Sequence, residues 1–240
     1  MILDWIYPPR CIACRMIFVP FHNKRRPWLC ENCRPLLTPV PKPVCPRCGH
    51  PATGICHACS GKNFFFKSHL AAFTYDETLR GILHEIKFRS QKQAAEGLGH
   101  ILAETSKEWP IPKPDFIVPV PLHPKKKRSR GFNQAEVLAR PLAKALGTPL
   151  ATDMLHRIKN TLPQSGLSRT AREHNLKGAF SYNIKKYGNT PKTILLIDDI
   201  FTGGATMNAC AKLLSESNDG TPDIYAMSLS LTVSDKLTNL

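Results

Sequence analysis

The sequence lacks a long hydrophobic run. Its longest uninterrupted aliphatic stretch runs only from Ile194 to Ile197, whereas a membrane-spanning helix needs roughly 20 apolar residues. The segment Met1–Pro9 has no basic n-region, no long apolar h-region and no small-residue cleavage site, which argues against a secretory signal. We therefore expect a cytoplasmic protein without a transmembrane segment, which could still lie peripherally at the inner face of the membrane.

Acidic residues are scarce. The 240 residues include 18 Asp and Glu against 33 Lys and Arg, which gives a formal net charge of +15. Such an excess favours partners that carry phosphate, such as nucleic acids, or anionic membrane surfaces. Because charge reports attraction and not fold, a generally basic protein without such a partner is the alternative.

Cysteine is almost absent after residue 59. The one exception, Cys210, is expected to be a small buried residue. The other eight form four C-x-x-C pairs: Cys11/Cys14, Cys30/Cys33, Cys45/Cys48 and Cys56/Cys59. Residues 1–62 show no sustained apolar periodicity, so this short segment cannot bury enough apolar surface to offset its ordering entropy. It needs cross-links.

Zinc is the cross-link that the spacing favours. Disulfides persist in oxidising compartments and no export signal is visible, whereas C-x-x-C presents two thiolates to one metal ion. Eight thiolates suffice for two closed, structural Zn(Cys)4 sites; a redox C-x-x-C or Fe–S ligation is the alternative. Either sequential or crossed pairing of the four motifs is compatible with the sequence. Gly49 follows a second cysteine where such a turn often needs a positive φ.

The rest of the chain reads as an α/β domain. Helices are expected over 79–88, 93–107, 133–146 and 206–215, and strands over 115–120, 179–184, 193–197 and 223–231. Strands that alternate with helices predict a doubly wound, mostly parallel sheet. We expect a zinc module over 1–64 and the main domain over 65–240, with Phe64–Phe66 as the seam; base stacking by these aromatic rings is the weaker alternative.

The segment 193–206 carries the clearest ligand motif. A buried strand is followed by Asp198 and Asp199 and then by a turn rich in Gly and Thr that opens a helix. Backbone N–H groups at the helix start, with the hydroxyls of Thr202 and Thr206, can cradle a phosphate monoester. The two carboxylates at the strand's end can hold ribose hydroxyls or Mg²⁺. An acidic strand end with no ligand is the alternative.

This segment resembles the phosphoribosyl pyrophosphate (PRPP) signature of type I phosphoribosyltransferases, with Gly203 where a second Thr is usual. The whole chain resembles the ComF (ComFC/GntX-like) family, which joins a zinc ribbon to a phosphoribosyltransferase domain. Besides the cysteine pairs, the match lies in residues 83–88, 118–124, 130–134 and 157–180. The resemblance implies a type I phosphoribosyltransferase fold that binds PRPP with Mg²⁺ through Asp198, Asp199, Thr202, Gly203, Gly204, Ala205 and Thr206.

The resemblance also assigns two basic segments. The loop 121–132 would bind pyrophosphate. Its five cations suit a diphosphate or a nucleic-acid backbone: Lys125, Lys126, Lys127, Arg128 and Arg130. The alternative is that these side chains contact only solvent. The segment 157–172 would be a mobile hood loop over PRPP. Its Arg157, Arg169 and Arg172 could neutralise a leaving pyrophosphate or contact only solvent or DNA. Lys87 either faces the ligand or is an exposed helix-end lysine.

Two functions follow from this sequence. The first is a ComF-like PRPP-binding protein that handles single-stranded DNA during DNA uptake in natural transformation, with a membrane channel or a helicase as partner. The alternative is a Mg²⁺-dependent phosphoribosyltransferase acting on a nitrogenous acceptor. The sequence identifies neither the acceptor nor a catalytic residue.

Overall fold

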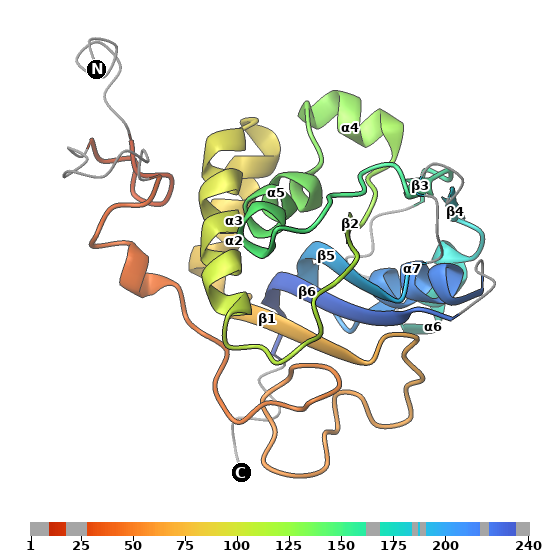
Figure 1. Ribbon diagram of the computed structural model, residues 1–240. Coiled ribbons are helices and arrows are strands. Elements are labelled where there is room, and N and C mark those ends of the chain that lie inside the picture. The colour runs from red at the N-terminus through yellow and green to blue at the C-terminus, as the bar shows by residue number, and fades with distance from the viewer. Residues whose placement is uncertain are drawn as a thin grey trace.

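A four-stranded parallel sheet forms the centre of the molecule (Figure 1). The computed structural model describes residues 10–17, 28–161, 169–183, 187, 191–216 and 221–233. The strands lie in the order β1 (Ser68–Thr74), β6 (Asp223–Leu231), β5 (Thr193–Phe201) and β2 (Phe116–Pro119), and each neighbouring pair is parallel. The mostly parallel sheet predicted from the sequence is confirmed.

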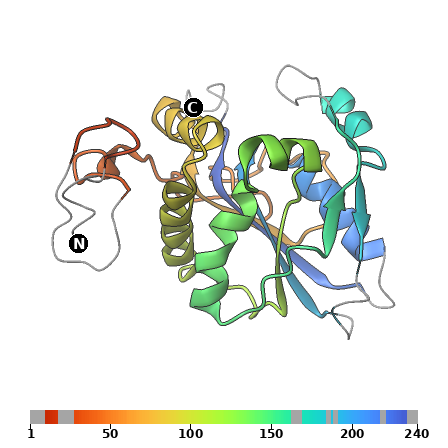
Figure 2. The same cartoon turned by 90° about the horizontal axis from the view of Figure 1, so that it is seen from above.

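Helices cover both faces of this sheet (Figures 1 and 2). One face carries α2 (Glu77–Phe88), α3 (Lys92–Ser106) and α5 (Gln134–Leu146), and the other carries α7 (Ala205–Glu216) with α6 (Arg169–Leu176). Side chains of β5 alternate between the two cores: Leu195 and Ile197 join the first, and Ile194 and Leu196 join the second. This doubly wound arrangement is consistent with the expected type I phosphoribosyltransferase fold.

Four elements differ from the sequence prediction. Strand β1 was not expected, because its SHLAAFT sequence has neither alternation nor a β-branched run. The segment 121–132 is not only a loop: it contains helix α4 (Pro124–Arg130). Helix α6 begins within the last four residues of the expected hood segment 157–172, and β3 (Leu155–Arg157) pairs antiparallel with β4 (Phe180–Tyr182) in a separate small sheet.

Local chemistry explains helix α4. His123 is the N-cap and its Nδ1 accepts a hydrogen bond from the backbone N–H of Lys125 at 3.3 Å. Pro124 occupies the first helical position, where its fixed φ is favourable. Gly131 ends the helix with a φ of 80°, a left-handed conformation that glycine adopts without a steric penalty.

The two zinc-ribbon units pack on different parts of the main domain. Ribbon 1 (described residues 10–17 and 28–33) lies beside α2 and α3 (Figures 1 and 2). The indole of Trp28 fills the space above Gly97, where an added Cβ would come within 1.5 Å of its Nε1. The guanidinium of Arg15 donates to Glu85 at 3.0 Å. These contacts fix ribbon 1 against the helices.

Ribbon 2 (residues 44–61) packs against the sheet instead. Between the ribbons, the backbone N–H of Val40 donates to Ala72 in the edge strand β1 at 3.3 Å. After ribbon 2, Phe66 is buried, and Phe64 stacks on it with ring centroids 4.6 Å apart. These rings behave as the expected seam, while the domain boundary at residues 64/65 stays a prediction.

Candidate functional site

The eight N-terminal cysteines form two groups of four. Within each group, all sulfur atoms lie within 4.8 Å of one another: Cys11, Cys14, Cys30 and Cys33 in ribbon 1, and Cys45, Cys48, Cys56 and Cys59 in ribbon 2. Both groups join neighbouring C-x-x-C pairs in sequence. Sequential pairing is therefore the arrangement that the structure shows, and crossed pairing is excluded.

Both groups have the geometry that zinc requires. In each group the first C-x-x-C pair forms a tight turn, and the residue after its second cysteine has a positive φ: 63° for Arg15 and 72° for Gly49. The positive φ of Gly49 was expected from the sequence. Zn–S bonds of about 2.3 Å place tetrahedral sulfur atoms about 3.8 Å apart. The sulfur–sulfur distances in the structure are 3.8 Å for Cys14–Cys30, 3.7 Å for Cys45–Cys59 and 3.4 Å for Cys48–Cys56.

The electrostatics of the thiols also fit a bound cation. Burial, and then hydrogen bonds with neighbouring thiols, raise the pKa of Cys33 well above its usual range. The pKa of Cys48 is raised mainly by burial as well. Four thiols packed this closely cannot all ionise without a compensating positive charge, and a divalent metal supplies it. The two groups therefore fit two structural zinc ions.

Asp198 and Asp199 lie inside β5, which continues to Phe201 and thus extends beyond the predicted end at residue 197. The backbone N–H of Asp199 donates to Oδ1 of Asp198 at 2.8 Å. Oδ2 of Asp199 lies 2.8 Å from Nζ of Lys87, which projects from the last turn of α2. Both members of this ion pair are about four-fifths buried. The acid pair thus holds one internal cation.

The two acids ionise very differently. Burial, and next the negative charge of Asp199, raise the pKa of Asp198 well above the usual aspartate range. Burial is the largest influence on Asp199 and opposes its ionisation, but the charge and hydrogen bond of Lys87, with smaller contributions from Asp198 and Arg130, together lower the pKa of Asp199. Burial similarly opposes the charge on Lys87, and Asp199 nevertheless raises its pKa. Asp199 is therefore held ionised, whereas Asp198 binds a proton more readily than an ordinary aspartate does.

A glycine turn follows the acids and leads into α7. Gly203 and Gly204 have φ values of 87° and 86°, which side chains rarely adopt. A Cβ on Gly204 would also lie 2.7 Å from the ring of Phe201 and 3.0 Å from that of Phe64. The positive φ explains why glycine suits position 203, where a second Thr is usual in the signature. Thr202, Ala205 and Thr206 flank the turn as the motif predicts.

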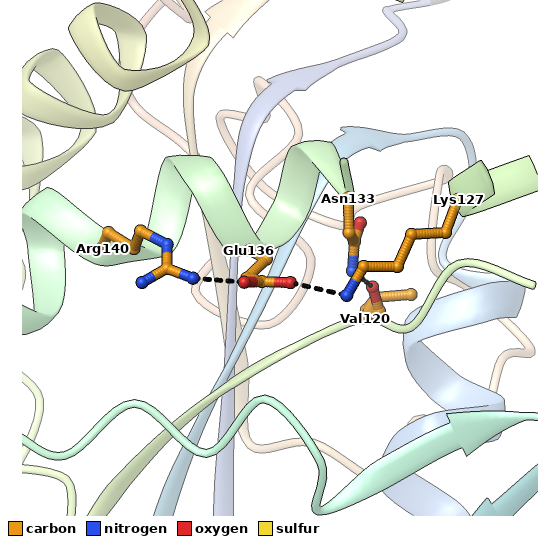
Figure 3. Close-up of polar contacts among 5 residues, drawn as sticks. All are labelled: Val120, Lys127, Asn133, Glu136 and Arg140. Atoms are coloured by element: carbon orange, nitrogen blue, oxygen red, sulfur yellow. Dashed lines mark hydrogen bonds and ion pairs between the residues drawn. The ribbon is translucent and has the colours of Figure 1, made fainter. Parts of the chain in front are cut away.

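The five cations assigned to the pyrophosphate loop differ in their partners and in their exposure to solvent. Lys127 pairs with Glu136 of α5 at 3.2 Å, and Glu136 also pairs with Arg140 (Figure 3). Arg130 donates to Gln134 at 3.3 Å, and its charge lowers the pKa of Asp199. Lys126 is partly buried, whereas Lys125 and Arg128 are exposed. The segment therefore combines cations near the acid pair with cations in solvent.

Asn133 connects α4 and α5 to the sheet. Its side-chain amide donates to the carbonyl of Val120, just beyond β2, at 3.0 Å (Figure 3). Both residues are buried, so this hydrogen bond holds the start of α5 close to the end of β2. The basic helix between them is thereby kept beside the strand ends.

Of the hood arginines, only Arg157 has a side chain within the described part of the chain. Its guanidinium donates to Thr161 and lies over the ring of Phe180, 5.4 Å from its centroid. Burial lowers the pKa of Arg157, and the negative charges of Cys210 and then Asp198 oppose this shift. Arg169 and Arg172 belong to helix α6, but their side chains and residues 162–168 lie outside the described part of the chain.

Sequence reasoning gave Lys87 too little weight. Lys87 follows Leu79 and Leu83 at spacings of four residues, so it continues the buried stripe of α2. A lysine on that stripe needs a buried partner, and this was the available signal. Cys210, in contrast, is fully buried as expected.

Ribbon 2 touches the strand that carries the acid pair. His69 stacks on Phe201 with ring centroids 3.9 Å apart, and its Nδ1 lies 2.9 Å from the carbonyl of Cys48. His50 Nε2 donates to the carbonyl of Thr232 at 3.1 Å, and the N–H of Thr232 donates to Phe201 at 3.1 Å. The second metal group is thus linked to the residue that precedes the glycine turn.

No helix within the described residues has the length and apolarity needed to cross a lipid bilayer. Residues 2–60 match the family model of the double zinc ribbon domain, which agrees with the two cysteine groups.

Three characterised proteins resemble the chain over most of its length. Competence protein F of Haemophilus influenzae is 30% identical over 215 residues, which cover 85% of this chain and 90% of that protein. The DNA utilization protein YhgH of Escherichia coli K12 is 28% identical over 92% of this chain and 96% of its own length. Competence protein ComFC of Bacillus subtilis is 29% identical over 78% of both chains.

Proposed function

The chain belongs to the ComF family of competence protein F, and on that premise we propose that it binds PRPP and handles single-stranded DNA during DNA uptake. The observation that carries the proposal is the clustering of an acid pair, a glycine turn and basic side chains at the carboxyl ends of parallel strands, where ligands bind in such sheets. The names of the relatives, competence protein and DNA utilization protein, supply the biological context.

Each chemical group of PRPP has a suitable partner in this cluster. The glycine turn and the start of α7 would receive its 5′-phosphate. Asp198 and Asp199 would hold the ribose hydroxyls, and Arg130, Arg157 and Lys126 would face the pyrophosphate. Mg²⁺ would supply additional positive charge to stabilise the pyrophosphate. Asp198 is the acid that would bind Mg²⁺, because Asp199 is already paired with Lys87.

DNA handling rests on charge. The excess of basic residues is large, and Lys125 and Arg128 of α4 are exposed next to the PRPP cluster. Single-stranded DNA would be held mainly through its phosphates, without strong sequence preference. We place the protein on the cytoplasmic side of the membrane, where a channel or helicase would pass the strand to it.

A titration with an oligothymidylate tests the proposal. Binding should weaken steeply with salt, and each neutralised phosphate contributes about −0.7 to the log–log slope. Replacing Lys125, Lys126, Lys127 and Arg128 by Ala should flatten the slope by about 1.4, because only Lys125 and Arg128 are both exposed and outside the ion pairs described above. Zinc content should stay unchanged. Absence of binding at low salt would refute DNA handling.

An enzymatic function is the second candidate, and the same acid and arginine cluster supports it. A phosphoribosyltransferase would release pyrophosphate from PRPP when a nitrogenous acceptor is supplied, chiefly through positioning and charge stabilisation. Pyrophosphate release that one acceptor accelerates, in a protein that binds no DNA, would make the enzyme the correct interpretation. PRPP binding without turnover would support the first proposal.

A further inference from the structure

A cavity of about 850 Å³ lies beside helix α7. Three segments line it: residues 62–65 after ribbon 2, residues 174–180 from the end of α6 to β4, and residues 202–216 from the glycine turn along α7. Because α7 rises about 1.5 Å per residue, its 12 residues give this α7 groove a wall about 18 Å long. The volume is within the range of about 300–1,000 Å³ that is usual for ligand sites.

The α7 groove is apolar at its base. Ala205, Ala209 and Leu213 follow one another at helical spacing and are partly buried in the core. Phe64 and Phe180 extend this apolar surface. Phe65 differs from its neighbours, because 42% of its surface is exposed although it lines the groove. An exposed phenylalanine on the wall of a cavity offers a ring face to a planar ligand.

The rim of the α7 groove is basic. Lys62, Lys177 and Lys212 line it, against one acidic residue, Glu216. Nζ of Lys212 lies 5.5 Å from the centroid of the Phe65 ring, and its ion pair with Glu216 is long, at 3.7 Å. Nζ of Lys62 would lie 3.8 Å from a Cβ on Gly203, so this cation reaches the glycine turn.

An aromatic wall between cations is the arrangement that holds single-stranded nucleic acid: bases stack on rings and phosphates pair with lysines. We propose that the α7 groove binds single-stranded DNA, with a base on Phe65 and phosphates at Lys62, Lys177 and Lys212. At about 3.4 Å per stacked nucleotide, the groove accommodates about five nucleotides. This inference rests on the proposed DNA function and adds the α7 groove to α4 as a second surface that contacts the strand.

The position of the α7 groove has a consequence for PRPP. The glycine turn lies at one end of it, so the 5′-phosphate of PRPP and one DNA phosphate would meet at the same backbone N–H groups and at Lys62. The two ligands therefore compete, and saturating PRPP should weaken DNA binding in the wild-type protein.

Substitutions in the α7 groove test the assignment with a fluorescent 20-nucleotide oligothymidylate. Phe65→Ala should weaken binding about tenfold, a factor that lies within the range of stacking energies per base. Phe65→Trp should bind normally, with its indole fluorescence quenched by the DNA. Lys62→Ala/Lys212→Ala should reduce the salt slope by about 1.4. Lys113→Ala/Lys144→Ala is the matched control, because it removes two exposed lysines, one before β2 and one in the last turn of α5, that do not line the groove.

The possible outcomes separate this inference from the proposed function. If the wild type binds DNA while the Phe65 and Lys62/Lys212 variants bind equally well, the α7 groove is not the site, although DNA handling stands. If the wild type binds no DNA at low salt, both are overturned. If an acidic peptide displaces the DNA and quenches the Phe65→Trp indole more strongly than DNA does, the groove is a protein-docking site and the inference is wrong. Zinc content and thermal unfolding show whether each variant is folded.

Discussion

Lys87 and Asp199 join helix α2 to strand β5 through a largely buried ion pair. Removing one partner of such a pair leaves an uncompensated charge, which is more damaging than the net contribution of the intact pair suggests. The pair also sets the charge state of the acid site, because Lys87 holds Asp199 ionised. Its influence on ligand binding should therefore depend on pH.

Lys87→Met should shift the pH dependence of PRPP binding. Without the ammonium group, burial dominates and the pKa of Asp199 rises. The carboxylate is lost as pH falls through that pKa, so the variant should lose PRPP affinity at a higher pH than the wild type does. Calorimetric titrations across the neutral and mildly acidic range measure this. Lys92→Met, an exposed lysine of α3, is the control and should leave the profile unchanged.

Asp198→Ala/Asp199→Ala should weaken PRPP binding at least tenfold. Each lost charge-assisted hydrogen bond costs about 1.5–3 kcal/mol, and binding should no longer respond to Mg²⁺. Because the double change leaves Lys87 without its partner, Asp198→Asn serves as a milder second variant that keeps the ion pair. Unchanged affinity in both variants, measured by calorimetry on folded protein, would contradict the PRPP assignment.

At the level of elements, helices α3 and α5 touch through a glycine. A Cβ on Gly99 would lie 2.6 Å from the backbone carbonyl of Leu138 and 3.0 Å from the ring of Pro141. The backbone of α5 cannot yield as a flexible side chain can. Close packing of these helices on the sheet therefore depends on one missing side chain.

Gly99→Ala should destabilise the protein by about 1–3 kcal/mol through overpacking. Gly81→Ala is the matched change, since Gly81 lies in α2 with no atom within 4 Å of the new Cβ. It should stabilise the protein by about 0.5–1 kcal/mol, because alanine loses less conformational entropy than glycine when the helix forms. Urea unfolding curves for the two variants should move in opposite directions, and a shift in the same direction would contradict this packing argument.

Elements with a strong periodic pattern could be predicted from the sequence. The apolar spacing of α2, the Gly147 cap of α5 and the aliphatic run of β5 all led to the right element. Strand β1 could not be predicted, because it is an edge strand that depends on pairing with β6 at the far end of the chain. Helix α4 depends on a histidine cap and a proline start within a run of cations, a pattern that equally describes a loop.

The motifs of the candidate site could be predicted from the sequence, but the contacts between its distant residues could not. The cysteine spacing located both metal groups, and the strand–acid–glycine order located the glycine turn, whose binding of phosphate stays a prediction. The partnership of Lys87 with Asp199 and the position of Arg157 over the ring of Phe180 depend on tertiary structure. Local spacing carries no information about such contacts between distant segments, although a lysine on a buried helix stripe indicates that one exists.

At the scale of the whole molecule, the two ribbons should contribute unequally to ligand binding. Ribbon 2 contacts Phe201 through His69 and reaches the glycine turn through Phe64, whereas ribbon 1 contacts the outer helices α2 and α3. Cys45→Ser/Cys48→Ser should therefore weaken PRPP binding much more than Cys11→Ser/Cys14→Ser does. Each double variant should lose one zinc ion per chain by elemental analysis.

Several results would contradict this prediction. A zinc content near zero in the wild type, with disulfides found by mass spectrometry, would rule out both metal centres. Equal loss of PRPP affinity in the two ribbon variants would show that the ribbons act through overall stability alone. Thermal unfolding curves of the same samples provide the comparison.

The pairing of β1 with β6 also constrains how the protein matures on the ribosome. Each cysteine group is complete early in the chain, so both knuckles can take up metal while translation continues. The sheet, however, joins its first strand to its last, and His50 reaches a carbonyl that follows β6. A nascent chain can therefore hold its metals while the edges of β1 and β5 still lack their shared partner, β6. The sheet that carries the acid pair becomes complete only after β6 has been synthesised.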